Sequence, residues 1–168
     1  ETLSFWQLVD LAIASQAPIC LDTSAIIEYG NGGAIASLVD PVMENDQIPL
    51  VYSMISIAEV LVRPAQVCDV SGMTAIVDAL TSRRNTEVVS FDQQQAVEAA
   101  WVRAETRLKL PDCAVIAAAR TTESVGIAGL DRAWSSRPLG VPFFYLPDVL
   151  ESGADDLSGT APAQDEGQ

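Results

Sequence analysis

The sequence contains no histidine. This absence excludes a Ser-His-Asp triad, a Cys-His nucleophile pair, histidine acid-base catalysis and histidine-ligated zinc. Any chemistry must therefore come from carboxylates, hydroxyls, thiols, guanidinium groups or a metal ion. The three cysteines, Cys20, Cys68 and Cys113, show no paired spacing. This favours reduced core thiols and a cytoplasmic location over a disulfide framework.

Aromatic residues and long apolar runs are also scarce. Aromatics make up 6% of the 168 residues, so Ala, Val, Ile and Leu must build most of the core. Apolar stretches such as AVIAAA (114–119) are far shorter than the roughly 20 residues that span a bilayer, so we expect a soluble protein without a membrane partner. A hydrophobic content of 49% suits a single domain with a substantial core.

Basic residues are few: nine Lys and Arg stand against 23 acids, a net charge of −14. Residues 151–168 hold five acids, no base and no apolar periodicity, which predicts an acidic, disordered tail. The remaining 18 acids and nine bases leave residues 1–150 at −9. Such a chain is not a general nucleic-acid binder that works through a basic face.

Five short apolar runs have the character of buried strands, at 18–22, 48–53, 86–91, 125–130 and 141–146. Segments with helical period lie between them, at 55–62, 70–83, 92–108 and 113–120. This alternation predicts an α/β fold, a three-layer α/β/α sandwich around a mostly parallel sheet of four or five strands. We expect a helical extension at 1–17, the domain at 18–150 and the tail at 151–168.

Four acids fall near the carboxyl ends of these strands, where such sheets usually carry their sites. Asp22 closes the first strand, Glu59 lies in the helix after the second, Asp112 opens the helix before the fourth, and Asp131 ends the fourth. Each also has a structural interpretation, because Asp22 and Asp131 suit helix caps and Asp112 suits a first helical turn. Glu59 lies in an apolar helical set and needs a partner, and Ser56 shares its helical face.

Four segments, in this order, resemble the PIN-domain nucleases, particularly the small bacterial and archaeal toxins of toxin-antitoxin operons. They are LDTSAII (21–27), SMISIAEVL (53–61), LPDCAVIAAA (110–119) and GLDRAW (129–134). The resemblance covers roughly residues 18–146. The family typically has Thr or Ser and then Asn before its last aspartate, whereas this chain has Gly129 and Leu130.

The resemblance implies a metal-dependent endoribonuclease, the toxin of a toxin-antitoxin pair. Its metal ligands and catalytic residues would be Asp22, Glu59, Asp112 and Asp131, with one or two Mg²⁺ or Mn²⁺ ions as cofactor. Support by hydrogen bonding would come from Thr23, Ser24 and Ser56. The implied partners are an RNA substrate and an antitoxin-like protein, and a homodimer is compatible with the family. Clustered carboxylates repel each other unless a cation neutralises them, and hard oxygen ligands favour Mg²⁺ or Mn²⁺ over zinc.

Three bases, Arg103, Arg107 and Lys109, precede the third acidic segment. They are candidates for contacts with RNA phosphates at the rim of the site. The alternative is a solvated helix face whose arginines pair with Glu98 or Glu105.

Two other functions compete with this interpretation. A phosphotransfer domain of similar architecture needs a lysine near its carboxylates after a late strand. The only lysine here, Lys109, precedes Asp112, so this alternative is disfavoured. A weakly active or inactive PIN-like protein-binding module stays open, because the fourth segment departs from the family pattern.

Overall fold

The computed structural model describes residues 3–157. Its elements follow in the order α1 (Phe5–Ser15), β1 (Ile19–Leu21), α2 (Thr23–Glu28), α3 (Ala36–Glu44), β2 (Leu50–Ser53), α4 (Met54–Val60), α5 (Val62–Gln66), α6 (Val70–Thr81), β3 (Thr86–Val89), α7 (Gln93–Thr106), α8 (Leu110–Thr121), β4 (Gly126–Gly129), the 3₁₀ helix η1 (Arg132–Ser136), β5 (Phe143–Tyr145) and α9 (Leu146–Leu157).

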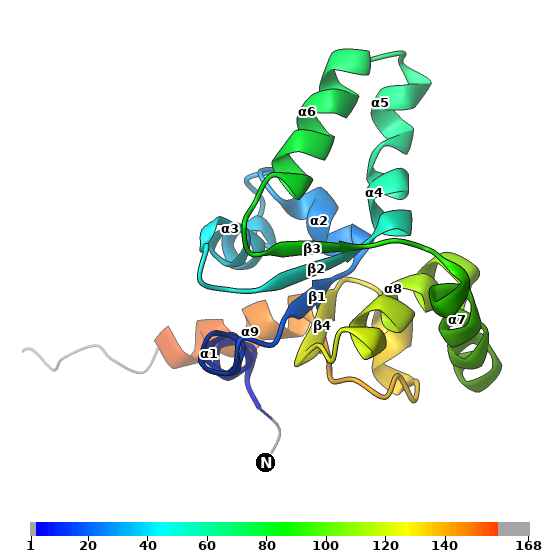
Figure 1. Cartoon of the computed structure of the whole chain (residues 1–168). Coiled ribbons are helices and arrows are strands. Elements are labelled where there is room, and N and C mark those ends of the chain that lie inside the picture. Colours follow the sequence, from blue (N-terminus) through cyan, green and yellow to red (C-terminus); the bar gives the residue numbers. More distant parts are fainter. Residues whose placement is uncertain (1–2, 158–168) are drawn as a thin grey trace, which may run out of the picture.

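The five strands form one parallel sheet in the order β3-β2-β1-β4-β5 (Figure 1). The predicted strands and the α/β sandwich are therefore confirmed. β1 lies at the centre, with Cys20 paired to Val51 of β2 and to Ile127 of β4. Because every strand runs the same way, the residues that follow β1, β2 and β4 emerge at one edge of the sheet.

Side chains of the central strands alternate between two cores, as the pleat requires. Ile19 and Leu21 of β1 and Ala128 of β4 join a cluster with α1, α2, α3 and α6 on one face. Cys20 and Ile127 point to the other face, where α7, α8 and η1 pack. Both faces are covered, which explains why the strands are apolar throughout.

The first and last helices belong to the same body as the sheet. α1 begins with a capping box between Ser4 and Gln7, and its Leu8 is fully buried against β4. α9 continues to Leu157, so residues 151–157 of the predicted tail are helical. The rest of that tail, 158–168, lies outside the described residues.

The segments between β1 and β3 hold helices that periodicity did not predict. α2 has six residues and α5 has five, which is too short for a periodic pattern to emerge. α3 contains Pro41, a residue that normally argues against a helix interior. Pro41 is the sixth of nine residues, so it removes one backbone donor from the interior of this short helix.

α5 and α6 project together from the body and form an arm (Figure 1). Leu80 is the one residue of α6 that is fully buried, whereas Val67 and Val70 at the tip are more than 70% exposed. Cys68 lies between them and is exposed, so the prediction of three core thiols holds only for Cys20 and Cys113. Within residues 3–157, every helix is too short or too polar to cross a membrane.

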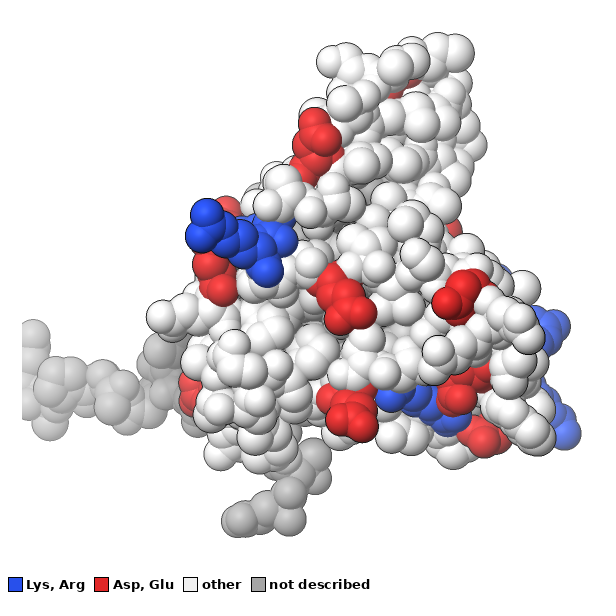
Figure 2. All heavy atoms as spheres, viewed as in Figure 1, with Lys and Arg blue, Asp and Glu red and all other residues white. Residues whose placement is uncertain are grey.

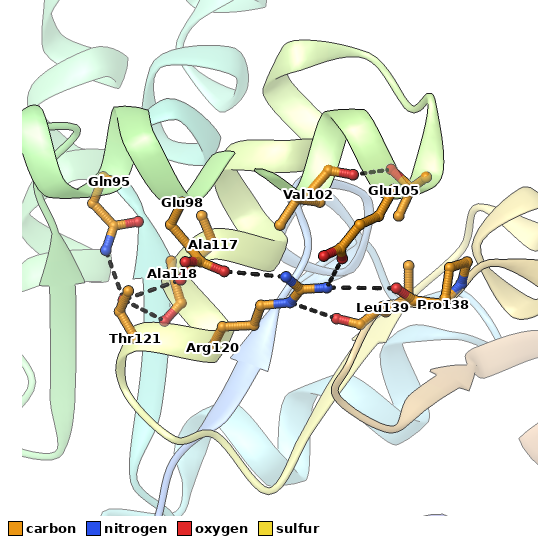
Figure 3. A network of polar contacts seen from close by, with 11 residues as sticks. Gln95, Glu98, Val102, Glu105, Ala117, Ala118, Arg120, Thr121, Pro138 and Leu139 are labelled. Carbon is orange, nitrogen blue, oxygen red and sulfur yellow. Dashed lines mark hydrogen bonds and ion pairs between the residues drawn. The ribbon is translucent and has the colours of Figure 1, made fainter. Parts of the chain in front are cut away.

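The half-buried Arg120 links α8 to α7 and to the loop before β5 (Figure 3). Arg120 forms ion pairs with Glu98 (3.1 Å) and Glu105 (2.8 Å) of α7. Its Nε also donates to the Leu139 carbonyl at 2.8 Å. Gly140 adopts a positive φ of 72°, and a Cβ there would lie 3.1 Å from Arg120 Nε. The loop therefore closes tightly over the guanidinium.

Candidate metal centre

Asp22 stands at the carboxyl end of the central strand and caps α2. Its Oδ2 accepts hydrogen bonds from the backbone amide of Ser24 (3.3 Å) and from the Ser24 hydroxyl (2.5 Å). Its own amide donates to Ala128 of β4 at 3.0 Å. The side chain is buried at 8% exposure, so this acid sits at the floor of the site. The capping interpretation is thus confirmed, and the carboxylate remains at the edge of the sheet where β1 ends.

Glu59 reaches the same place from α4. Its Oε2 accepts a hydrogen bond from the Thr23 hydroxyl at 2.7 Å. The expectation that Ser56 would support Glu59 is wrong, because the Ser56 hydroxyl is fully buried and has no partner among the described residues. Glu59 itself is exposed, so its apolar neighbours along the helix do not enclose it. The hydroxyl support for Glu59 comes from α2 instead.

Asp112 and Asp131 complete the set from two other elements. Asp112 lies in the first turn of α8, after Pro111, and is half-buried. Proline and an acid both favour the start of a helix, which explains why α8 begins here. Asp131 is exposed and caps η1, with Oδ1 accepting from the Ala133 amide at 2.9 Å. Both local interpretations therefore hold in the structure.

The charges of the four acids act on one another. Burial is the main cause that raises the pKa of Asp22, the Ser24 hydrogen bonds oppose the rise, and the Glu59 charge adds to it. Burial also raises the pKa of Asp112, followed by the charges of Asp22 and Asp131 and, more weakly, of Glu59. The structure thus brings all four predicted acids within electrostatic range at one edge of the sheet.

The donor set suits a hard divalent cation, since it consists of carboxylates and hydroxyls without histidine or thiolate. Within residues 3–157, no three acidic or thiol side chains stand close enough together to form a ready-made cage. Mg²⁺ does not require one, because it keeps several waters and usually takes one or two protein carboxylates plus substrate phosphate. The residues present therefore fit such an ion with an incomplete protein shell.

The predicted basic residues lie at the corner between α7 and α8. Arg103 is in the last turn of α7, Arg107 ends that helix in a left-handed conformation (φ 60°), and Lys109 precedes α8. Lys109 is thus three residues from Asp112. The alternative pairing of these arginines with Glu98 or Glu105 is wrong, because both glutamates bind Arg120.

Figure 2 shows that acids are scattered over the visible face, whereas basic atoms gather in small groups. One of these groups lies at the right, near the position of α7 in Figure 1. Basic charge is therefore local on this acidic protein, as its composition requires.

Sequence reasoning missed how β4 contacts Asp22. A Cβ added at Gly129 would lie 3.0 Å from Asp22 Cβ and 3.2 Å from its Oδ2. The amide of Leu130 donates to the Ser24 hydroxyl at 2.9 Å. The glycine at the strand end was visible in the sequence, but only the register of β1 against β4 reveals what it touches.

The fold is shared with several solved structures. A toxin-antitoxin complex from Klebsiella pneumoniae aligns with a TM-score of 0.58 at 17% identity, over 76% of this chain and 97% of that chain. FitAcB from Neisseria gonorrhoeae aligns with a TM-score of 0.56 at 18% identity, over 76% of this chain and 97% of that chain. VapC20 from Mycobacterium tuberculosis is described as a sarcin-ricin-loop-cleaving toxin. It aligns with a TM-score of 0.57 at 16% identity, over 71% of this chain and 99% of that chain. No curated protein sequence matches significantly.

At these identities the structural likeness concerns the fold alone. The sequence itself matches the PIN domain over residues 19–136, a range that begins with β1 and contains all four acids. That match spans most of the chain. The chain therefore belongs to the PIN domain family of nucleases.

Proposed function

We propose that this PIN domain is an endoribonuclease that uses Mg²⁺ or Mn²⁺ to hydrolyse phosphodiester bonds in RNA. One observation carries the proposal: acids that follow β1 and β4, or lie on α4 and at the start of α8, meet at one edge of the sheet. Burial raises the pKa of Asp112, and the charges of Asp22, Asp131 and Glu59 raise it further. Acids that repel one another in this way destabilise the metal-free protein, and a divalent cation relieves the repulsion. Helix capping accounts for Asp22 and Asp131 singly, whereas the meeting of four acids at one edge is expected for a metal centre.

One or two of the four carboxylates Asp22, Glu59, Asp112 and Asp131 would bind the ion directly, and the others would reach it through coordinated water. When bound, such an ion lowers the pKa of a coordinated water and stabilises negative charge on phosphate. It would thereby supply the base that a chain without histidine lacks. Ser24 fixes Asp22, and Thr23 fixes Glu59, through the hydrogen bonds to their carboxylates.

RNA is the proposed substrate, with Arg103, Arg107 and Lys109 as phosphate contacts beside Asp112. Three cations can guide a strand to the cleft without making the whole surface basic, which fits the net charge of −14. The wider acidic surface would repel nucleic acid, so we expect weak binding that declines further with salt.

Cleavage of a mixed RNA pool by the purified protein tests the proposal. We expect slow cleavage with Mn²⁺ or Mg²⁺, none with excess chelator, and none in Glu59→Gln. Asp92→Asn is the matched control, because Asp92 caps α7 outside the site and asparagine caps about as well as aspartate. An intact RNA pool with Mn²⁺, under conditions in which another PIN nuclease cuts it, would favour the alternative of an inactive protein-binding module.

An antitoxin-like protein is the proposed partner. The Klebsiella pneumoniae structure of similar fold is described as a toxin-antitoxin complex. A mostly apolar groove of about 340 Å³ runs between α2, α4, α5 and α6, lined by Ile26, Tyr29, Val60 and Ile76 among others, with Glu59 at its edge. An amphipathic helix of the partner would bury these side chains.

The groove predicts a specific loss of binding. Ile76→Glu should abolish co-purification with the co-expressed product of an adjacent antitoxin-like gene. The matched change Thr74→Glu, on the exposed side of α6, should retain it. Equal binding by the two variants would mean that the partner docks elsewhere.

We also propose a homodimer formed through α7. Val97 and Trp101 are 55% and 63% exposed one helical turn apart, and Leu110 at the start of α8 is 49% exposed. A large aromatic and two aliphatic side chains in water favour association. Val97→Glu with Trp101→Glu should therefore halve the mass measured by light scattering, and a monomeric wild type would refute the dimer.

A further inference from the structure

The Asp22 side chain packs directly on the backbone of β4. The β4 carbonyl of Ala128 accepts the Asp22 amide at 3.0 Å. The next residue, Gly129, has no side chain, and a Cβ there would approach Asp22 Cβ to 3.0 Å and Phe143 Cε2 to 3.3 Å. Contacts of this length are tighter than most real Cβ contacts, so the neighbouring atoms would have to move by a few tenths of an ångström. Gly129 therefore provides the space in which the Asp22 carboxylate sits.

The Ser24 hydroxyl fixes that carboxylate from the other side. It donates to Asp22 Oδ2 at 2.5 Å and accepts from the Leu130 amide at 2.9 Å. One hydroxyl thus joins the start of α2 to the residue after β4. The Ser24 amide donates to the same Oδ2 at 3.3 Å, so both Ser24 donors hold one oxygen of the carboxylate.

We propose that Gly129 is a positioning residue, which together with the Ser24 hydroxyl holds the Asp22 carboxylate in a single orientation for the metal. The proposal rests on the metal-dependent function above. It also explains the unusual Gly129-Leu130 pair, since Ser24 and a backbone amide here provide the polar support at the end of β4. A larger residue at 129 would displace the carboxylate that Ser24 holds.

Mn²⁺ binding measured by electron paramagnetic resonance tests this proposal. Ser24→Ala should weaken Mn²⁺ binding roughly 10- to 100-fold, as loss of a hydrogen bond to a metal ligand typically does. Ser24→Thr keeps the hydroxyl and should restore the affinity. Ser37→Ala, at an exposed serine of α3, is the matched control and should bind like the wild type. Wild-type affinity in Ser24→Ala would overturn the proposal.

The glycine is tested by Gly129→Ala, which should also weaken Mn²⁺ binding at least tenfold, as expected when a metal ligand loses its support. Gly33→Ala is the matched control, because a Cβ there meets nothing closer than 3.9 Å. Should Gly129→Ala fail to fold, Ser24→Ala and its threonine rescue still decide the question. Full affinity in a folded Gly129→Ala would overturn the role of the glycine.

A second measurement needs no metal. NMR couplings of the Asp22 side chain should report one rotamer in the metal-free wild type and an average of rotamers in Ser24→Ala. A single unchanged rotamer in Ser24→Ala would overturn the proposal. If the wild type binds no Mn²⁺, the metal-dependent function fails, while this measurement still decides whether Ser24 orients Asp22.

Discussion

Two of the four acids are held by hydroxyl groups, and a third is held by a backbone amide. Asp22 and Glu59 accept hydrogen bonds from Ser24 and Thr23, which are neighbours on α2. Asp131 accepts from a backbone amide at the start of η1. Asp112 likewise occupies a helix start, in the first turn of α8. A side-chain substitution can remove a hydroxyl but leaves an amide in place.

This difference predicts where the site is sensitive. The half formed by Asp22 and Glu59 depends on the hydroxyl groups of two small side chains, Ser24 and Thr23. The half formed by Asp112 and Asp131 depends on where α8 and η1 begin, which proline, helix dipole and backbone geometry fix together. Substitutions around the first half should therefore damage the site more than those around the second.

The largest effect should come from removing one acid of each half. Asp22→Asn with Asp112→Asn should abolish the increase in melting temperature that Mn²⁺ causes, because a ligand stabilises only the state that binds it. Without metal the double variant should melt at a higher temperature than the wild type. Both pKa values are raised in the folded protein, so their ionisation destabilises it as pH increases, and the amides remove that penalty.

Scanning calorimetry with and without Mn²⁺ measures both effects. If Mn²⁺ raises the melting temperature of the double variant as much as that of the wild type, the ion binds elsewhere. A lower metal-free melting temperature would show that the acids stabilise the fold, contrary to the repulsion inferred here.

Next in size is the loss of the Thr23 hydroxyl. Thr23→Val keeps the shape of the side chain but leaves Glu59 Oε2 without its partner, so cleavage should slow roughly 10- to 100-fold. Thr74→Val on α6 is the matched control. Ala133→Ser, which keeps the amide that binds Asp131, should change the rate little. Equal losses in Thr23→Val and Ala133→Ser would remove the distinction between the two halves.

The next prediction concerns Arg120, which anchors α8 to α7. Its loss should affect the stability of the fold but not metal binding at the first turn of α8. Arg120→Met removes two ion pairs and a hydrogen bond to Leu139, all partly exposed, and should lower the free energy of unfolding by about 1–2 kcal/mol. Mn²⁺ affinity should not change, because Asp112 lies two turns away. Arg132→Met is the control, since its pair with Asp148 is long (3.7 Å) and exposed. Weaker Mn²⁺ binding in Arg120→Met would link the anchor to the site.

The smallest effect concerns RNA binding. Arg103→Gln, Arg107→Gln and Lys109→Gln should each lower the salt dependence of RNA binding by up to ~0.7 in the logarithmic slope, the value for one phosphate contact on a single strand. Arg84→Gln is the control, since Arg84 precedes β3 at the opposite edge of the sheet. Filter binding over a range of salt concentrations measures the slope, and equal slopes in all four variants would exclude a basic rim.

The strands and the four acids could be predicted from the sequence because their signals are local. Each strand is a short apolar run, and each acid follows or opens a recognisable element. Asp22 and Asp131 lie where they were expected because one parallel sheet brings the ends of β1 and β4 to the same edge. The resemblance of LPDCAVIAAA to a family segment added the role of Asp112, which composition alone could not provide.

The support around the acids could not be predicted because it depends on contacts between distant segments. Ser56 shares a helical face with Glu59, yet the hydroxyl that binds Glu59 belongs to Thr23, 36 positions away. Glu98 and Glu105 pair with Arg120 rather than with Arg103 or Arg107, because α7 packs along α8. Local spacing cannot distinguish between such partners.

The central claim is that Asp22 and Asp112 bind a divalent cation, which neutralises the repulsion between their charges. Calorimetric titration of the wild type with Mn²⁺ at a series of pH values tests it most directly. Because the pKa values of both aspartates are raised, protons compete with Mn²⁺ at a higher pH than for ordinary aspartates. As the pH falls from neutral, the affinity should therefore begin to decline above the ordinary aspartate range near ~4. Failure to bind at neutral pH, or an affinity that stays constant down to that range, would contradict the account.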